Sequence, residues 1–388
     1  MIYRQQQHPK VIVAVKVTLL TNLVPPYRTN AYDALHRRAV SAGGGLRVIC
    51  TQQGEPQRNW PATTASFMRE RLPGLLLPLG ENRTLSIPFG VTRTLQKSPP
   101  SVLILAGFGI AQWQGQNWAR QRRIPTILQF DGWAGSDDAY TNPVRCKLRQ
   151  HMVARADGFI AASTRGVAWF EQQGIPNQKV AIAPIPPSFE APDETNLKDR
   201  ENRQYDLLWC GRTTNSKGFD RFIEIVDKLS NQGITDKIAI VGSTDITNTT
   251  QLVSAIGVSE RTDVFGQLPP DQLPAILNNA KLCLFPSRND AYGVGVIDAI
   301  ACGAVVLASS MVGCAPDVLE NSEILPVDND KAWVTACIRL LSDPDHWEQT
   351  REIQAGKINF NTPTHHGAAM WDAITHATCE VSESRRWN

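Results

Sequence analysis

Short apolar runs alternate along the first half of the chain with segments whose apolar residues recur every three or four positions. Such runs are typical of strands buried on both faces, and their alternation with helices indicates a parallel sheet covered on both sides. Helical patterns include Asn30–Ala42 and Pro143–Ala156. The expected strands are Val11–Leu19, Leu46–Cys50, Val102–Leu105, Thr126–Gln129, Gly158–Ala162 and Val180–Ala183. The pattern predicts the α/β class.

A proline-rich segment separates this half from the next. Residues 183–192, APIPPSFEAP, hold four prolines in ten residues, and the charged stretch Asp193–Arg203 follows. Such composition marks a linker, and 388 residues are enough for two domains, each with its own core. We predict domains at residues 1–190 and 191–362.

The alternating pattern then restarts. Strands are expected at Asp206–Trp209 and Ile238–Val241. The expected helices are Phe219–Gln232, Thr249–Ile256, Asp271–Asn279 and Lys331–Leu341, with a helical pattern from Trp347 to about Thr378. The second half therefore has the same class as the first.

The most informative stretch is residues 281–303, KLCLFPSRNDAYGVGVIDAIACG. An apolar run, Lys281–Phe285, leads into the polar loop Ser287–Tyr292, a helix opened by Gly293 and Gly295, and a second run, Val305–Ser309. Ligands bind at such strand-to-helix loops. Backbone N–H groups at a helix start form a phosphate site when glycine leaves them accessible.

Two acids stand eight residues apart in this stretch, Asp290 in the loop and Asp298 in the helix. Asp290 could instead be a plain helix N-cap. Asp298 has apolar neighbours, and a carboxylate among them costs free energy unless something binds it. A solvated outer helix face is the alternative for Asp298.

The stretch resembles the signature of retaining GT-B glycosyltransferases of family 4, which is usually Glu-x7-Glu. The matching residues are Pro286, Ser287, Asp290, Gly293, Asp298, Ala299, Ala301 and Gly303. The resemblance implies that Asp290 faces the donor sugar and that Asp298 holds the nucleotide ribose. Both are Asp here, one methylene shorter than Glu. It also implies two Rossmann-like domains facing across a cleft, with a last helix, in residues 363–388, that crosses back to the first domain.

The loop after the expected strand Asp206–Trp209 carries two cations. Arg212 and Lys217 can neutralise a diphosphate in the bound donor and as it departs; a surface turn with two solvated cations is the alternative. The family has the same form here, a glycine and arginine followed by Lys-Gly. The expected donor contacts are therefore Gly211, Gly293, Val294 and Gly295, and by resemblance Gly266 and Gln267 lie near the base. No metal or other cofactor is then required.

In the first half, residues 21–28, TNLVPPYR, resemble the opening of a subgroup associated with bacterial surface polysaccharides. This makes Asn22, Tyr27 and Arg28 candidates for the acceptor side. Arg28 could reach an anionic group or form a structural salt bridge. Asp131 matches the acid of the family's His-Asp pair, whose histidine is absent here, and we count Asp131 among the catalytic candidates.

Charge divides the chain unevenly. Residues 1–188 hold 22 Lys and Arg against 9 Asp and Glu, and the remainder holds 17 against 28. The basic half could face an anionic membrane or nucleic acid, or it could simply attract the other domain. Acceptors in the subgroup are often lipid-linked, which favours a membrane and not nucleic acid. The basic and aromatic residues singled out are Trp113, Trp118, Arg120, Arg122 and Arg123, with Arg145, Lys147, Arg149, His151 and Arg155 on a helix.

The remaining composition indicates a cytoplasmic protein, and the lipid-linked acceptors of the subgroup imply a location at the inner face of the plasma membrane. Eight cysteines without a CxxC pair are typical of reduced core thiols. Val11–Leu20 resembles a first strand more than a signal peptide, and no apolar run reaches the 18 residues that a membrane span needs. The seven histidines show no metal-ligand spacing.

The expected function is transfer of a sugar from a nucleoside diphosphate sugar to a hydroxyl of a glycan or lipid-linked glycan, with retention by resemblance. Two alternatives stay open. One is another GT-B enzyme, such as a nucleotide-sugar epimerase, and the other is a catalytically weak partner subunit that binds sugar nucleotides.

Overall fold

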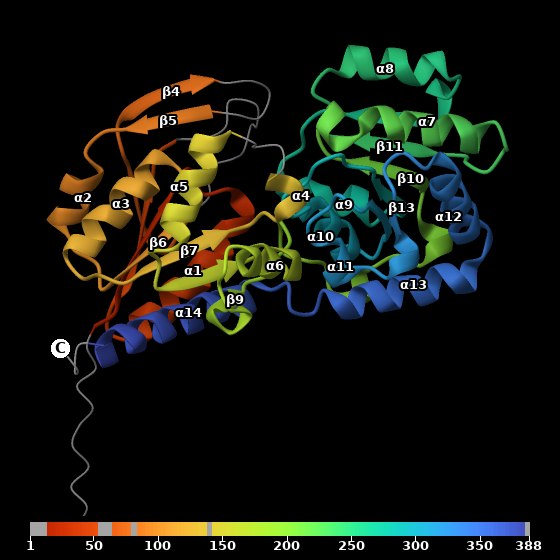
Figure 1. The fold of residues 1–388 in the computed structure, drawn as a ribbon. Coiled ribbons are helices and arrows are strands. Elements are labelled where there is room, and N and C mark those ends of the chain that lie inside the picture. The colour runs from red at the N-terminus through yellow and green to blue at the C-terminus, as the bar shows by residue number, and fades with distance from the viewer. Residues whose placement is uncertain (1–13, 53–63, 79–83, 138–141, 385–388) are drawn as a thin grey trace, which may run out of the picture.

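The chain forms two α/β domains that lie side by side in a computed structural model (Figure 1). The structure describes residues 14–52, 64–78, 84–137 and 142–384. Each domain contains a parallel sheet with helices packed on it, and the predicted fold class is confirmed. The first predicted strand begins outside the described residues and is observed from Lys16.

The first domain is built on a seven-stranded sheet, as far as the structure describes it. Its strands are β1 (Lys16–Thr21), β2 (Gly45–Cys50), β3 (Met68–Arg71), β6 (Val102–Ala106), β7 (Thr126–Phe130), β8 (Gly158–Ala161) and β9 (Val180–Ile182). They pair in parallel in the order β3-β2-β1-β6-β7-β8-β9. The strand order reverses between β1 and β6, and in such sheets ligands bind at this switch point.

Helices cover both faces of this sheet, and two buried apolar clusters lie against it. The helices are α1 (Pro26–Ser41), α2 (Val91–Lys97), α3 (Ile110–Gln121), α4 (Ala134–Asp137), α5 (Pro143–Val153) and α6 (Thr164–Gln172). A separate antiparallel ribbon, β4 (Gly74–Pro78) and β5 (Thr84–Pro88), lies between β3 and α2 in the chain. The sequence pattern did not predict this ribbon.

The second domain repeats the design with a six-stranded sheet in the described residues. Its strands are β10 (Tyr205–Cys210), β11 (Ile238–Val241), β12 (Thr262–Phe265), β13 (Ala280–Phe285), β14 (Val305–Ser309) and β15 (Ile324–Leu325). The parallel order is β12-β11-β10-β13-β14-β15, so the switch point lies between β10 and β13. These are the strands that precede the two loops predicted to bind the donor.

The helices of the second domain pack on both faces of its sheet. They are α7 (Phe219–Ser230), α8 (Ile246–Ala255), α9 (Leu273–Leu277), α10 (Val294–Ala301), α11 (Ala315–Val318), α12 (Asp330–Ser342) and α13 (Pro344–Lys357). The helix predicted at Asp271–Asn279 is a 3-10 turn, Pro270–Gln272, followed by the short α9. Pro274 lies at the start of α9, where its missing N–H costs no helix hydrogen bond.

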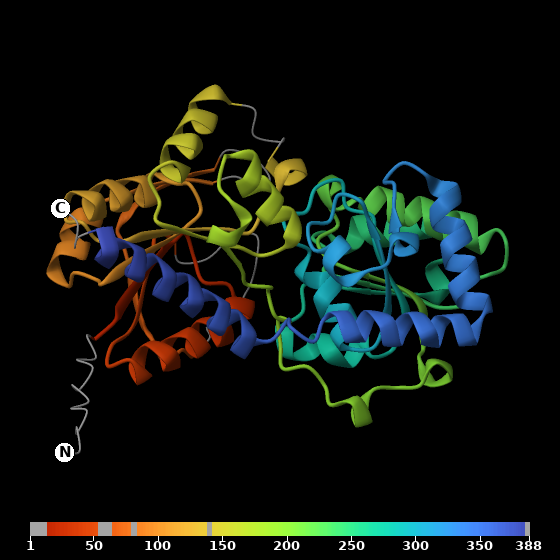
Figure 2. The same ribbon diagram turned by 60° about the horizontal axis from the view of Figure 1, so that its bottom comes forward.

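The last helix, α14 (Pro363–Ser384), returns to the first domain and lies against α1 and β8 (Figure 2). Met370 and Ile374 of α14 are fully buried in one cluster with Val17 of β1 and Leu35 of α1. Gly367 faces Ala34 so closely that a Cβ there would lie 2.8 Å from the Ala34 Cβ. The core of the first domain therefore contains residues from both ends of the chain.

The expectation that the cysteines are core thiols is only partly correct. Cys283, Cys302, Cys314 and Cys337 are buried, whereas Cys146 and Cys379 are exposed. Burial raises the pKa of the Cys337 thiol to about 12. Within the described ranges, no helix is both long enough and apolar enough to cross a bilayer.

Candidate functional site

The loops that follow β10 and β13 are joined to each other. The backbone N–H groups of Arg288 and Asn289 donate to the Ser216 carbonyl oxygen at 3.0 and 3.1 Å. Gly218 has φ +75°, and a Cβ there would overlap the Pro286 carbonyl oxygen, so this close approach requires glycine. The first loop is thereby fixed against the second.

This contact brings Lys217 to Asp290. The Lys217 Nζ lies 2.6 Å from the Asp290 Oδ2, and the side chains are 25% and 16% exposed. The backbone N–H of Asp290 donates to the Met311 carbonyl oxygen at 3.2 Å, which fixes the loop from its other side. Asp290 is not the helix N-cap: α10 is capped by Gly293, without a side-chain cap bond. Two predicted catalytic residues thus form one half-buried ion pair.

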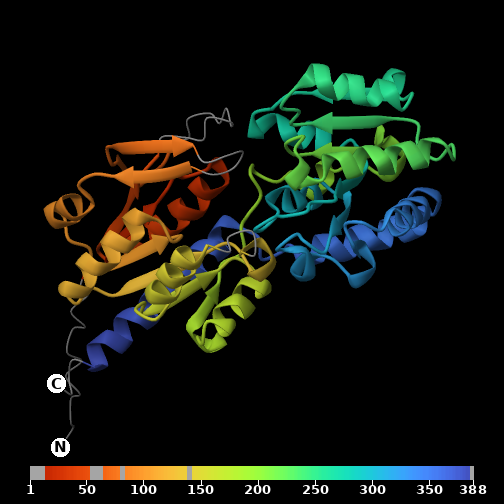
Figure 3. The ribbon, with the colours of Figure 1, turned by 45° about the horizontal axis from the view of Figure 1, so that its top comes forward.

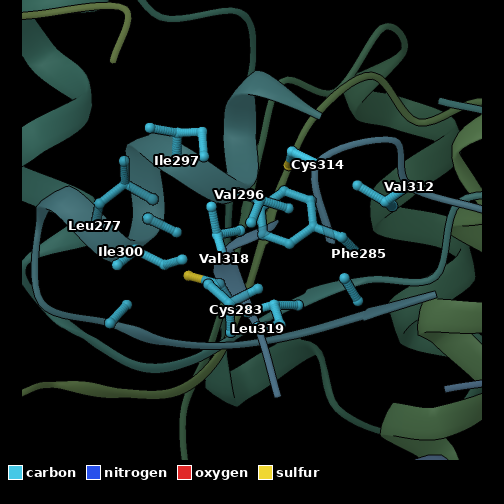
Figure 4. Close-up of a cluster of buried hydrophobic side chains, with 14 of the residues drawn as sticks. Leu277, Cys283, Phe285, Val296, Ile297, Ile300, Val312, Cys314, Val318 and Leu319 are labelled. Atoms are coloured by element: carbon cyan, nitrogen blue, oxygen red, sulfur yellow. The ribbon is translucent and has the colours of Figure 1, made fainter. Parts of the chain in front are cut away.

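The start of α10 is held against the carboxyl ends of β10 and β13. A Cβ at Gly295 would lie 2.9 Å from the Phe285 ring and 3.5 Å from the Cys210 carbonyl oxygen. Figure 4 shows Val296, Ile297 and Ile300 of this helix in the apolar cluster around Phe285. The helix start is therefore a rigid end whose first N–H groups are directed toward the switch point.

Asp298 is buried, with 4% of its surface exposed, so the solvated-face alternative is wrong. Its Oδ1 accepts a hydrogen bond from the Ser188 backbone N–H at 2.7 Å, and its Oδ2 accepts one from the Ser188 hydroxyl at 2.9 Å. Burial raises the pKa of Asp298 to about 7, opposed by these two bonds. Ser188 lies in the proline-rich linker, so Asp298 connects α10 to the passage between the domains. The ribose contact stays a prediction.

The other expected donor residues lie on neighbouring loops at the same sheet edge. Gly211 directly follows β10, and its carbonyl oxygen accepts a hydrogen bond from the Trp209 indole at 2.7 Å. The backbone N–H of Gly242, after β11, donates to the Gly266 carbonyl oxygen at 3.0 Å. Arg212 follows Gly211 in the loop after β10, and Gln267 follows Gly266 in the loop after β12. The loops after three adjacent strands therefore form one edge.

In the first domain, Arg28 is buried and forms an ion pair with Asp131, with 2.6 Å between Nη2 and Oδ2. Arg28 also donates to the His366 Nε2 at 2.8 Å, and the His366 Nδ1 donates to the Pro184 carbonyl oxygen at 2.9 Å. Burial, with the Arg28 charge nearby, lowers the pKa of His366 to about 3. His366 is therefore neutral, and of the two roles considered for Arg28 the salt bridge is the observed one.

Two further acceptor-side candidates lie near the start of α1. The Asn22 carbonyl oxygen accepts hydrogen bonds from the backbone N–H groups of Thr51 and Gln52, at 3.1 and 2.7 Å. Tyr27 packs against the apolar cluster of the second domain that contains Phe285. Asn22 thus joins the loops after β1 and β2, and Tyr27 lies at the contact between the domains.

Trp133 connects the catalytic candidates of the two domains. Its indole N–H donates to the Asp290 carbonyl oxygen at 3.1 Å. Trp133 itself lies only two residues along the chain from Asp131. The Arg165 guanidinium lies 4.3 Å above the Trp133 ring and donates to the Ser310 and Val312 carbonyl oxygens at 2.7 and 3.0 Å. The carboxyl ends of β7 and β13 therefore meet. Sequence reasoning missed Trp133 and Arg165, which lie outside the motifs it used.

No group of three or more His, Cys, Asp or Glu that could hold a metal ion occurs in the part of the chain that the structure describes. The charged groups at the edge of the second sheet include Arg212, Lys217 and Asp290, together with the N–H groups at the start of α10. Arg288 lies in the same loop as Asp290 and pairs with Asp220. Chemically, this arrangement can bind an anion.

Comparison with known proteins identifies both halves. Residues 15–186 match the family described as "Glycosyl transferase 4-like domain", and residues 193–357 match "Glycosyl transferases group 1". Each half of the chain therefore matches a glycosyltransferase domain family, and the fold is GT-B. Its fold is similar to that of sucrose-phosphate synthase from Thermosynechococcus elongatus, with a TM-score of 0.66 and 16% identity over 93% of this chain and 100% of that one.

A second GT-B structure with a similar fold is that of Anabaena HepE in complex with UDP and glucose. It has a TM-score of 0.67 and 12% identity, and the match covers 93% of this chain and 99% of that one. At these identities the likeness concerns the fold alone.

Curated relatives match shorter segments of this chain. D-inositol 3-phosphate glycosyltransferase of Salinispora tropica is 27% identical over 157 residues, which are 37% of this chain and 33% of that protein. Alpha-D-kanosaminyltransferase of Streptomyces kanamyceticus is 21% identical over 231 residues, 55% of this chain and 59% of that protein. The chain thus spans between about a third and three fifths of these two relatives.

Proposed function

We propose that the protein transfers a sugar from a nucleoside diphosphate sugar to a hydroxyl group of an acceptor, with retention of the anomeric configuration. The observation that carries the proposal is the Lys217–Asp290 ion pair, at the switch point of the second sheet and beside the start of α10. Retention comes from the resemblance to family 4. The relatives named as glycosyltransferases and the structural neighbour with bound UDP support the donor class.

The donor's diphosphate would lie between Arg212, Lys217 and the first N–H groups of α10. Transfer breaks the bond between the anomeric carbon and the diphosphate oxygen, and the same carbon forms a bond to the acceptor oxygen, which loses its proton. Negative charge grows on the departing diphosphate, and prepositioned cations and N–H dipoles stabilise that charge. These groups supply the stabilisation without a divalent metal.

Asp290 would act at the sugar and Asp298 at the ribose. Lys217 has to exchange its contact with Asp290 for one with phosphate when the donor binds, and this exchange frees the Asp290 carboxylate for the sugar hydroxyls. Asp298 would accept a hydrogen bond from a ribose hydroxyl through the oxygen lone pairs that Ser188 leaves available. Asp131 lies two residues from Trp133, which contacts the Asp290 loop, and would approach the sugar from the first domain.

The acceptor would enter from the first domain, as a glycan or lipid-linked glycan of bacterial polysaccharide or glycolipid biosynthesis, at the inner face of the plasma membrane. The support is the resemblance of residues 21–28 to the surface-polysaccharide subgroup and the position of Tyr27 at the domain contact. Arg28 would position Asp131 for this step, because the buried Arg28 guanidinium pairs with the Asp131 carboxylate, which is 41% exposed.

Donor consumption, measured with and without acceptor, tests the proposal. UDP-, GDP- and ADP-sugars are first screened for a rise in melting temperature, since a ligand that binds the folded state stabilises it. A transferase releases nucleoside diphosphate in proportion to glycosylated acceptor. Conversion of the donor without any acceptor would instead identify an epimerase, and binding without turnover would identify a partner subunit.

A further inference from the structure

An apolar ribbon projects from the outer side of the first domain. Among the described residues, the strands β4 and β5 pair only with each other, and Figure 3 shows them apart from the main sheet with α2 and α3 nearby. Leu75, Leu76 and Leu77 are 55%, 38% and 45% exposed. Neighbouring residues in a strand point to opposite sides, so both faces of the ribbon present leucine to solvent. Isolated exposed leucines are ordinary, but three in one two-stranded ribbon form a patch.

Other exposed apolar side chains belong to the same region. Phe89 directly follows β5 and is 51% exposed, and Trp113 of α3, which packs against β5, is 40% exposed. We refer to Leu75, Leu76, Leu77, Phe89 and Trp113 together as the apolar patch.

The charge on the segments next to the patch is mostly positive, and Glu70 of β3, which is 35% exposed, is paired with Arg47. The continuous segment 84–130, which contains β5, α2 and α3, holds five basic residues and no acidic residue. Arg93 and Lys97 of α2 and Arg120 at the end of α3 are exposed to solvent. The Arg122 guanidinium lies 4.7 Å from the Trp118 ring, and Arg123 follows it. An apolar patch with an excess of cations beside it fits a lipid surface, in which anionic headgroups cover an apolar interior.

We infer that the β4–β5 ribbon docks the protein on an anionic lipid bilayer. Leucine and aromatic side chains of the apolar patch enter the boundary between headgroups and acyl chains, and Arg93, Lys97 and the arginines of α3 contact the phosphate groups. The inference rests on exposed side chains that the proposed sugar transfer does not use, so it and the proposed sugar transfer can fail separately. If both hold, a lipid-linked acceptor would be presented next to the domain that receives it.

Vesicle sedimentation tests the docking surface without any sugar substrate. The full chain is mixed with phosphatidylglycerol–phosphatidylcholine vesicles or with pure phosphatidylcholine vesicles. We expect binding to the anionic vesicles, weakened by high salt, because screening reduces contacts between exposed charges. Leu75→Gln with Leu77→Gln should lower the apparent partition coefficient by about tenfold or more, because apolar burial drives insertion. Arg93→Gln with Lys97→Gln should lower it on anionic vesicles only.

The matched control is Leu252→Gln with Ile353→Gln, two leucine-sized residues of the second domain that are 37% and 40% exposed. This variant should bind vesicles as the parent does, and melting curves should show all variants folded. Absence of binding by the parent, or unchanged binding by the ribbon variant, overturns the inference. A third outcome also overturns it: light scattering shows a dimeric parent and a monomeric ribbon variant, and the parent does not bind vesicles. The apolar patch would then join two copies of the chain.

Discussion

Lys217 and Asp290 lie 73 residues apart in the sequence and form an ion pair of 2.6 Å between the two loops at the switch point of the second sheet. Each of the two residues would also contact the donor, Lys217 at the diphosphate and Asp290 at the sugar. The free protein therefore keeps both groups in place through each other. Donor binding replaces one ion pair by two contacts with the ligand, and this predicts that the two residues are energetically coupled.

Removing either of the two cationic side chains proposed to bind the diphosphate should lower turnover. We expect Arg212→Ala and Lys217→Ala each to lower kcat by about 10²- to 10³-fold, if each group stabilises charge that develops on the leaving diphosphate. Release of nucleoside diphosphate under saturating donor measures the effect. Lys228→Ala is the control, because Lys228 pairs with Asp330 elsewhere in the same domain. Near-parental turnover in both variants would remove these cations from the site.

Activity should not depend on a divalent metal. Arg212, Lys217 and the start of α10 already provide positive charge at the proposed diphosphate position, so chelation leaves that charge unchanged. Initial rates are compared before and after dialysis against EDTA, and again after adding magnesium or manganese. A rate that collapses in EDTA and recovers with metal would contradict the proposed site.

The two aspartates should separate binding from turnover. If Asp298 holds the ribose, Asp298→Ala should raise the Kd for the nucleoside diphosphate by roughly 10- to 150-fold, since one charged hydrogen bond corresponds to about 1.5–3 kcal/mol. Asp290→Ala should lower kcat more than it weakens nucleotide binding, because sugar contacts that strengthen in the transition state act on the rate. Calorimetric titration of the free nucleoside diphosphate gives the first quantity, and steady-state kinetics give the second.

Melting curves first establish that both aspartate variants are folded, since Asp298→Ala also removes the partner of Ser188. Ser188→Ala serves as the control, because it removes the hydroxyl contact and keeps the carboxylate. If folded Asp298→Ala binds nucleotide as tightly as the parent, the ribose assignment fails and the residue acts only between α10 and the linker.

Stability should depend on pH through Asp298. Its pKa in the folded protein is about 7, above its ordinary value of 3.8, so the folded state holds the proton more tightly than the unfolded state. The contribution of protonated Asp298 to the free energy of unfolding is complete below pH 3.8, the ordinary pKa. It is lost as pH rises through about 7, at up to about 1.4 kcal/mol per pH unit. Asp298→Asn removes this titration, because an amide can accept from the Ser188 N–H and donate to its hydroxyl.

Urea unfolding at several values between about pH 5 and pH 7.5 checks this prediction. The free energy of unfolding of the parent should fall relative to that of Asp298→Asn as pH rises. The other titrating groups are the same in both proteins and cancel in the difference. Parallel curves would mean that the Asp298 pKa is ordinary.

The sequence predicted most of the parallel strands and the two loops at the switch point of the second sheet. Apolar runs such as Lys281–Phe285 are bounded by proline and glycine, so their limits can be read locally, and β14 was predicted with the bounds observed. The β4–β5 ribbon was missed because Leu75–Leu77 shows no alternation and its surroundings have no helical periodicity.

Contacts that complete the site could not be predicted, because they join residues far apart in the chain. Ser188 binds Asp298 across 110 residues, Trp133 binds the Asp290 carbonyl across 157, and His366 binds Arg28 across 338. In the sequence, His366 is only one of seven histidines without metal-ligand spacing. Its position near Asp131 depends on the return of α14, which no local pattern of residues specifies.

That return has a consequence for how the protein folds during synthesis. A ribosome delivers the chain from its N-terminus, and domains generally fold as units as they emerge. Here the cluster formed by Val17, Leu35 and their neighbours stays incomplete until Met370 and Ile374 have been made. The second domain can fold before that moment, whereas the first cannot close its core. The domain that is translated first is therefore finished last, and until then it exposes apolar surface on which a chaperone could act.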